Sequence, residues 1–393
     1  MSVGAIQTLR SAGSPGAVVK HKRGIMSTEY SFGGMDRRDF LKLGGAGLAG
    51  AVLLGTAGAT GSRVLAQEAS SLIAEFESSA TEYGVPQDLL LAMGYVNTMW
   101  EMPPPRMTAY REDDIHGRGA YGIMQLVRNP WEDTLGEASR LTGLSEEQLK
   151  NDRAANIRGG AAVLAGIQGQ DRPADLNGWQ EAVAEYGGID LYATEVYETL
   201  RSGASATTST GERVELAPQD VEVPRTFTAQ RRRADYSRAD WRAARRGNYT
   251  NRDRGVKQID MVIVHVAQGS YSSTISWFKN SVSNVSAHYV VSQKGKVAQC
   301  VRNEDIAWHA GNWRYNTKSI GIEHAGYAGN PDTWTTRMYR SSARLSAYLS
   351  RRYNIPVDRR RFIGHREVPG VDRTCPGSHF NWDRYLRLVR RYR

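Results

Sequence analysis

Two histidines and one cysteine in the second half of the chain form a donor set that suits a transition metal. His265 lies inside the apolar run Met-Val-Ile-Val-His-Val at residues 261–266, and His365 and Cys375 belong to a polar segment at residues 364–377. Zinc binds imidazole nitrogen and thiolate sulfur, and a catalytic zinc keeps a fourth position open for water. A strand and a distant loop must therefore meet in space. Taken singly, His265 is better explained as a core histidine than as a ligand, and Cys375 is also explained as a small buried hydrophobe.

A second strand adds a carboxylate. The stretch Ser-Ile-Gly-Ile-Glu-His at residues 319–324 alternates along its length, so Glu323 shares one face with Gly321, while His324 and two isoleucines occupy the other. The glycine leaves room for a ligand on the carboxylate face, or alternatively marks a bulge or weak point of the strand. Glu323 is the candidate proton carrier, and His324 is expected to pack in the core.

The order of these short motifs resembles that of the zinc amidases of the peptidoglycan recognition and phage-lysozyme type, which are N-acetylmuramoyl-L-alanine amidases. The resemblance covers about residues 236–393. The motifs that carry it are MVIVHV at 261–266, SAHYVV at 286–291, AWHAG at 307–311, SIGIEH at 319–324, GHRE at 364–367 and TCPG at 374–377. It implies one Zn²⁺ held by His265, His365 and Cys375, with Glu323 as the catalytic acid and base.

Several further site residues follow from the same resemblance. Arg373 stands where many relatives have a lysine near the developing oxyanion, so it keeps the charge but in a planar fork. Ala287 replaces a tyrosine found in some phage-type relatives, which leaves Glu323 as the better candidate for proton transfer. The candidate substrate-binding residues are His309, Trp308, Trp313 and His288, and for His288 a structural place behind the ligands is favoured over metal ligation.

The front of the chain, residues 70–202, reads as a run of amphipathic helices. The pieces GAYGIMQL at 119–126, NIRGGA at 156–161 and AVAEYGG at 182–188 resemble the lysozyme-like fold of lytic transglycosylases. Those enzymes place an essential glutamate where this chain has Asn97, which cannot protonate a glycosidic oxygen. Glu101 lies one helical turn, about 6 Å, further along. We expect this domain to bind glycan or position the amidase; a bifunctional enzyme using Glu101 is the alternative.

The first 66 residues predict an export signal. Arg37 and Arg38, followed by a glycine-rich apolar run and the small-residue site Val-Leu-Ala at 64–66, resemble a twin-arginine signal. Translation from Met26 or Met35 is an alternative start. The apolar run is short for a spanning helix, so no stable membrane insertion is expected after cleavage. The mature protein is then secreted to the cell wall.

Charge and composition fit that location. The net charge is +10, and the two cysteines, Cys300 and Cys375, predict no structural disulfide if Cys375 binds metal. No groove-reading motif supports nucleic acid as a partner, whereas anionic cell-wall polymers attract a basic surface. A Gly/Ser/Thr-rich stretch places a linker at residues 203–233.

The predicted architecture is thus two domains, an all-α lysozyme-like domain and then an α/β amidase domain (residues 234–393) with a mixed central β-sheet flanked by helices. The predicted function is cleavage of the amide between N-acetylmuramic acid and L-alanine by a monomer acting on peptidoglycan or muropeptides. A non-catalytic muropeptide-binding protein is the alternative.

Overall fold

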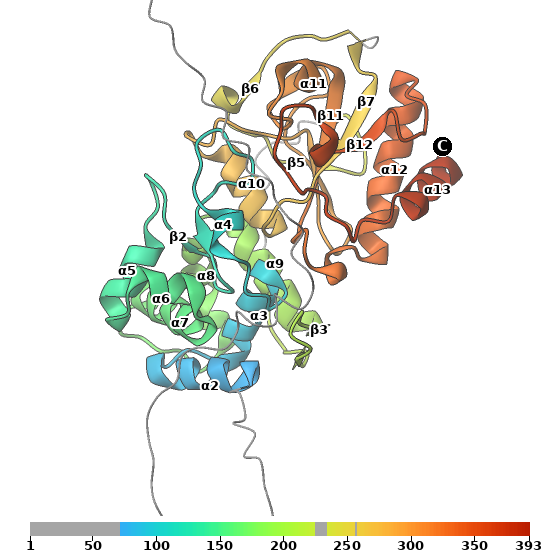
Figure 1. Cartoon of the computed structure of the whole chain (residues 1–393). Coiled ribbons are helices and arrows are strands. Elements are labelled where there is room, and N and C mark those ends of the chain that lie inside the picture. The colour runs from blue at the N-terminus through green and yellow to red at the C-terminus, as the bar shows by residue number, and fades with distance from the viewer. Residues whose placement is uncertain (1–70, 225–233, 256–257) are drawn as a thin grey trace, which may run out of the picture. The chain divides into compact units, whose positions relative to one another are not determined.

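The computed structural model describes residues 71–224, 234–255 and 258–393, all within one compact unit (Figure 1). We call residues 71–224 the helical part and residues 234–393 the sheet part. The predicted export signal at residues 1–66 lies outside the described residues. Among the residues described, none of the helices combines the length and the apolar character needed to cross a membrane.

The helical part packs around one hydrophobic core. Its helices are α2 (Leu72–Tyr83), α3 (Gln87–Thr98), α4 (Pro105–Thr108), α5 (Thr134–Thr142), α6 (Glu146–Asn151), α7 (Arg153–Gln168), α8 (Gln180–Tyr186) and α9 (Asp190–Ser202). Two short hairpins pair β1 (Ala120–Tyr121) with β2 (Leu126–Val127) and β3 (Ala204–Thr207) with β4 (Arg213–Leu216). Polar caps fix the helix starts: Ser71 opens α2, and Ser145 with Gln148 forms a capping box on α6.

The conspicuous polar and glycine motifs of this part are packing devices. The buried Asn156 amide accepts a hydrogen bond from Met124 N (2.8 Å) and donates to Leu149 O (2.8 Å), tying α7 to the β1–β2 turn. A Cβ at Gly122 would fall 2.2 Å from Asn156, and one at Gly160 would fall 2.5 Å from Met124. Both glycines are therefore required by close approach.

The range predicted as linker begins with structure. The β3–β4 hairpin occupies residues 204–216, and Val214 and Leu216 join the core of the helical part. Arg153 binds Glu75 (2.7 Å) and Glu212, which holds the hairpin against α2 and α7. The alternating pattern of Arg213–Leu216 buries one residue in two, so this stretch has a strand's period despite its polar start. Residues 225–233 lie outside the described residues.

The sheet part is built on a mixed six-stranded sheet in the order β12-β7-β11-β8-β9-β5. Its strands are β5 (Asp240–Trp241), β7 (Met261–Val264), β8 (Tyr289–Val291), β9 (Val297–Gln299), β11 (Ser319–His324) and β12 (Phe362–Gly364), and a separate pair joins β6 (Tyr249–Thr250) to β10 (Ile306–Ala307). Strands β12, β7, β11 and β8 run parallel, and β8 pairs antiparallel with β9. The predicted α/β fold with a mixed central sheet is confirmed for this part.

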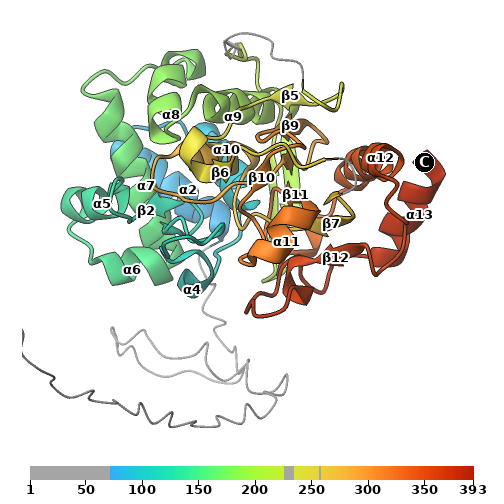
Figure 2. The ribbon, with the colours of Figure 1, turned by 90° about the horizontal axis from the view of Figure 1, so that it is seen from above.

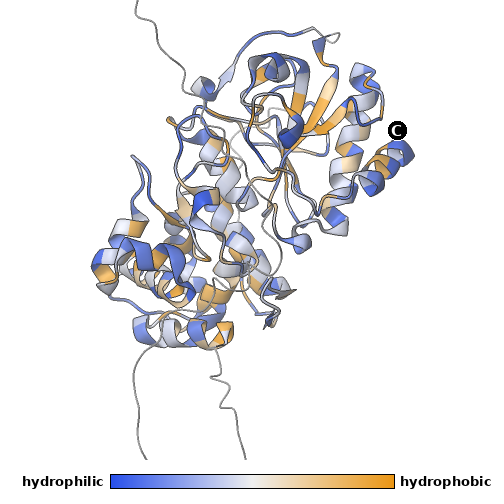
Figure 3. Ribbon diagram, viewed as in Figure 1, coloured by the Kyte–Doolittle hydropathy of each residue, from blue (hydrophilic) through white to orange (hydrophobic). Residues whose placement is uncertain are grey.

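Helices cover both faces of the sheet. The helices are α10 (Tyr271–Lys279), α11 (Trp313–Lys318), α12 (Thr336–Tyr353) and α13 (Trp382–Tyr392). Helices α12 and α13 lie together on one side, against the even-numbered residues Val262, Val264 and Ile322 (Figure 2). Both β7 and β11 are buried strands, and hydrophobic colouring gathers on the central sheet in Figure 3. The odd-numbered residues of these strands face away from α12, and this face carries the site.

The two parts share apolar and polar contacts. Ile115 and Leu191 of the helical part belong to the same buried cluster as Ile275 and Phe278 of α10. Lys296 of the sheet part pairs with Glu198 on α9 at 2.6 Å. The contact therefore continues the core of the sheet part across the boundary between the two parts.

Candidate metal centre and active site

The predicted ligands lie at the carboxyl ends of neighbouring parallel strands. His265 directly follows β7, and its N–H donates to Ile322 O of β11 at 2.9 Å. Val264 and Val266 pack under α12, so the intervening His265 side chain points to the opposite face. Glu323 occupies the same face of β11. In an α/β sheet this end of the strands is where ligand sites form.

The loop after β12 supplies the other two predicted ligands. His365 starts a short 3₁₀ turn (His365–Glu367), and Arg366 N donates to Cys375 O at 2.9 Å, which closes the loop between the two. Val266 N donates to Cys375 Sγ at 3.0 Å. The thiol is therefore fixed beside the end of β7.

A histidine that the sequence did not single out completes the cluster. His116 of the helical part, together with His265, His365 and Cys375, presents one donor atom each, all within 4.8 Å of one another. His116 is 6% exposed. It lies in a polar loop of the helical part, where no local sequence pattern indicates burial. The sequence could have suggested it only if every histidine of the chain had been considered as a possible fourth metal ligand.

The donor atoms fit a cation. His265 Nδ1, both ring nitrogens of His365, His116 Nε2 and both oxygens of Glu323 are buried without a hydrogen-bond partner. Such groups are costly to bury unless something binds them. Burial keeps the imidazoles neutral, because it lowers the pKa of His265 and brings that of His365 to about 3. Neutral imidazole is the form that coordinates metal. Burial also raises the pKa of the Cys375 thiol, a cost that a bound cation offsets.

A chain of hydrogen bonds fixes the tautomer of His265. Ser319 Oγ donates to Tyr315 O at 2.6 Å, so it accepts from His309 Nε2 at 3.3 Å. His309 Nδ1 is then free of hydrogen and accepts from His265 Nε2 at 3.0 Å. His265 Nδ1, which faces the cluster, is left with its lone pair. Metal-binding histidines are commonly oriented in this way through their second nitrogen.

These hydrogen bonds give His309 a position that differs from the one predicted for it. His309 is 1% exposed and lies behind His265, whereas we predicted a substrate contact. The loop folds inward because Asn316 Oδ1 accepts from both His309 N (3.1 Å) and Ala310 N (2.8 Å). The space beside Gly321, expected to admit a ligand, is filled by this imidazole: a Cβ there would fall 2.5 Å from His309 Cγ.

Glu323 is buried at 0% exposure beside the cluster. Its Oε1 lies 3.7 Å from His265 Nδ1 and 3.5 Å from His116 Nε2, distances too long for strong hydrogen bonds. Burial raises its pKa, and the nearby His116 partly opposes that rise. A carboxyl group with a raised pKa is suited to taking up and releasing protons. His324, on the other face, bonds to His265 O and Ser342 Oγ, which confirms its core position.

The remaining predicted residues surround the cluster at different depths. Arg373 Nη2 pairs with Asp114 Oδ2 of the helical part at 2.8 Å. Trp308 is half-buried and donates from Nε1 to Thr250 Oγ1 at 3.0 Å, and Trp313 is 54% exposed. His288 is buried, with Nδ1 accepting from Gly321 N at 3.1 Å, so it ties β11 to its neighbour as the structural alternative expected. Cys300 is buried and free.

The imidazole nitrogens and the thiol of this site could hold a metal ion, and the carboxylate beside them suits proton transfer in a hydrolytic reaction. Residues 255–378 match the profile of a family described as N-acetylmuramoyl-L-alanine amidase. N-acetylmuramoyl-L-alanine amidase A of Achromobacter lyticus is 35% identical over 173 residues, which cover 39% of this chain and 95% of that protein. The chain therefore belongs to the N-acetylmuramoyl-L-alanine amidase family, which confirms the predicted enzyme class.

Other relatives match over shorter lengths. The 1,6-anhydro-N-acetylmuramyl-L-alanine amidase AmpD of Haemophilus influenzae is 32% identical over 112 residues, 27% of this chain and 59% of that protein. Among solved structures, a selenomethionine derivative of AmpD matches 39% of this chain and 95% of its own, with 23% identity and a TM-score of 0.32. The family profile starts at residue 255 and so does not include the helical part.

Proposed function

We propose that this protein is a zinc-dependent peptidoglycan amidase that cuts the bond between the lactyl group of N-acetylmuramic acid and L-alanine. The observation that carries the proposal is the convergence of His265, His365 and Cys375 beside Glu323. His265 Nδ1, both ring nitrogens of His365 and both Glu323 oxygens are buried there without a hydrogen-bond partner. Borderline-soft zinc suits a donor set of imidazole and thiolate.

The chemistry divides between the metal and the chain. Zinc, when bound, acidifies water and polarises the carbonyl group of the amide. Glu323 takes the proton from the attacking water and returns it to the leaving nitrogen, so that the C–N bond breaks into a carboxylate and the free amine of L-alanine. His309 and Ser319 hold His265 in the tautomer that leaves Nδ1 unprotonated. Arg373 is the candidate to stabilise negative charge on the carbonyl oxygen, once it is released from Asp114.

We further propose that the enzyme works outside the cytoplasm, on the cell wall. The twin arginines at positions 37 and 38 and the net charge of +10 support this location, because the wall is an anionic polymer network. Muropeptides or the intact wall are then its substrate, and the enzyme acts there as a secreted monomer.

The helical part is proposed to position the amidase or bind glycan rather than cut sugar. Asn97, whose amide cannot protonate a glycosidic oxygen, is 5% exposed and lines a cleft between the parts. Glu101 accepts hydrogen bonds from Ser209 N (2.7 Å) and Ser209 Oγ (2.8 Å), so its carboxylate serves the β3–β4 turn.

Digestion of purified sacculi by the zinc-loaded full chain tests the proposal. New L-alanine amino groups without new reducing or anhydro-sugar ends are the expected products, and a chelator should stop their release. Sugar ends that disappear in Glu101→Gln would favour the bifunctional alternative. Tight binding of muropeptides with no product at all would favour the non-catalytic alternative.

A further inference from the structure

The loop of the helical part that carries His116 is a built element. Backbone bonds from Arg111 N to Gly117 O (3.1 Å) and from Gly117 N to Asp114 O (3.0 Å) close residues 111–117 into a compact turn. His116 N donates to Asp114 Oδ1 at 2.9 Å, which fixes the backbone at His116. A Cβ at Gly117 would fall 2.7 Å from Arg111 O, so the turn requires glycine there. The hydrogen bonds within residues 111–117 therefore fix the backbone from which the His116 imidazole extends.

Three different contacts fix this loop on the sheet part. Ile115 packs into the apolar cluster of α10, and Asp114 binds Arg373 at 2.8 Å. Between them, His116 Nε2 points among the ligand atoms, buried and without a hydrogen-bond partner. A buried imidazole that points from a hydrogen-bonded turn into a cluster of donor atoms has the position expected of a metal ligand.

The loop also seals the site. His265, Glu323, His365 and Cys375 are all at most 2% exposed. A substrate on a polymer cannot reach groups that are covered to this extent. Zinc sites with four protein ligands are closed, whereas catalytic sites keep one position for water.

We propose that His116 is a fourth zinc ligand, so that the helical part closes the metal site in the resting chain and must withdraw before hydrolysis. The inference rests on the proposed function for the identity of the metal and its other ligands. Withdrawal frees the position for water and also releases Arg373 from Asp114, so one movement of residues 111–117 would prepare both groups.

X-ray absorption at the zinc edge of the full-length wild-type protein tests this without any substitution. Three imidazoles and one sulfur are expected. Two imidazoles, one sulfur and an oxygen would overturn the role of His116 and leave the proposed function intact. Zinc without sulfur or imidazole ligands would contradict the proposed function itself.

Variants of the full chain provide the second arm. His116→Ala should weaken zinc binding by about 10- to 100-fold in a chelator competition, because the effect of a direct ligand should at least equal that of a residue supporting one. The same variant should hydrolyse a small soluble muropeptide faster than wild type. His379→Ala is the matched control, since His379 is exposed and outside the cluster. Unchanged zinc affinity in a folded His116→Ala protein would overturn the proposal.

Asp114→Asn provides a second test in case His116→Ala does not fold. It keeps the size of the side chain but weakens the pair with Arg373, so the loop should dock less firmly while His116 remains present. Hydrolysis of the soluble muropeptide should rise above wild type, with zinc affinity lowered less than in His116→Ala. A rate equal to wild type in this variant would also count against closure by the loop.

Discussion

The two parts of the described chain use buried polar groups in opposite ways. In the sheet part, His265, His365 and Glu323 converge on one point and leave their lone pairs unshared. In the helical part, Asn97 is buried and Glu101 accepts a hydrogen bond from Ser209 N. Yet the helical part sends His116 into the other part's cluster. The sheet part therefore carries the reacting groups, and the helical part controls how exposed those groups are.

Loss of the thiolate should have the largest effect. Cys375→Ala removes the thiolate from the proposed ligand set, so zinc content and amide hydrolysis should fall together to background. Zinc content by mass spectrometry and release of L-alanine amino groups measure both. Cys300→Ala is the matched control, because Cys300 is equally buried but lies outside the cluster. Full zinc content and turnover in Cys375→Ala would end the ligand assignment.

Glu323→Gln should separate chemistry from metal binding. Glutamine keeps the shape but cannot take up a proton, so hydrolysis should fall by roughly 10²–10⁴-fold while zinc content stays near wild type. Steady-state rates on a soluble muropeptide check the fall. An unchanged rate would move the proton-transfer role to another group.

Gly321→Ala should act through His309. The added methyl group would meet the imidazole at 2.5 Å and push it from His265, so zinc affinity should drop by about 10- to 100-fold. Gly247→Ala is the control, since a Cβ there meets nothing within 4 Å. Equal zinc affinities in the two variants would show that the hydrogen-bond chain does not support the ligand.

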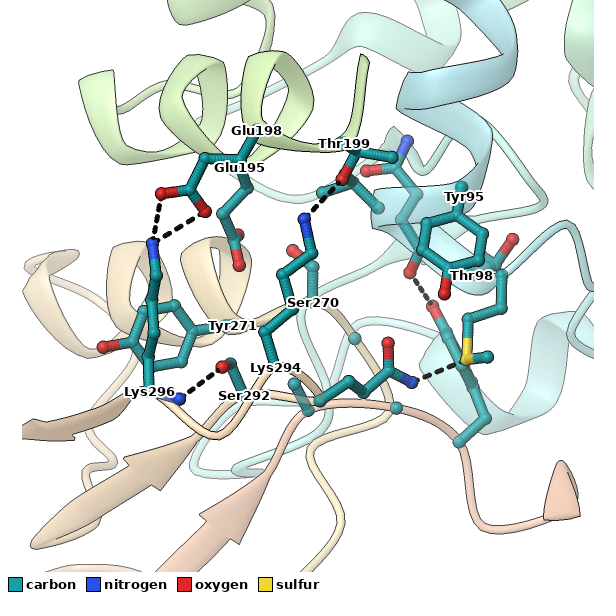
Figure 4. Close-up of a pocket in the computed structure, with 18 residues that line it drawn as sticks. Tyr95, Thr98, Glu195, Glu198, Thr199, Ser270, Tyr271, Ser292, Lys294 and Lys296 are labelled. Carbon is teal, nitrogen blue, oxygen red and sulfur yellow. Dashed lines mark hydrogen bonds and ion pairs between the residues drawn. The ribbon is translucent and has the colours of Figure 1, made fainter. Parts of the chain in front are cut away.

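The smallest effect is expected at the contact between the parts. Lys296 binds Glu198, and Lys294 donates to Thr199 at 3.2 Å, around the cleft shown in Figure 4. Lys296→Met removes one partly exposed pair, worth about 0.2–1 kcal/mol. If the helical part covers the site, hydrolysis of a small substrate should rise by up to about fivefold, and salt should reduce the difference from wild type. A lower rate at every salt concentration would argue against such a cover.

The sequence predicted the sheet part well, because the patterns that define its strands and its ligand motifs lie within short stretches of the chain. Alternation in residues 319–324 assigned Glu323 and His324 to opposite faces, and the structure places them so. The ligand motifs after β7 and β12 lie at strand ends, where a parallel sheet must bring them together. Roles for Trp308 and Trp313 remain predictions, because their exposure alone assigns no contact.

What the sequence did not reveal depends on contacts between distant segments. Whether His309 points outward or inward is decided by Asn316 and by the space at Gly321, which no local pattern contains. His116 stands in a polar loop, and its burial arises only when Ile115 and Asp114 dock on the other part. The hairpin at residues 204–216 was predicted as part of a linker because its composition is typical of a loop, and only half of β4 is apolar.

The complete burial of Glu323 has a kinetic consequence. A reaction centre that is covered in its most populated state turns over only during excursions to an uncovered one, so the measured rate is the intrinsic rate multiplied by the uncovered fraction. Each 1.4 kcal/mol of docking free energy then lowers that rate about tenfold. Substitutions outside the donor cluster, at Ile115 or Leu191, would therefore change the measured rate through the docking free energy of the two parts.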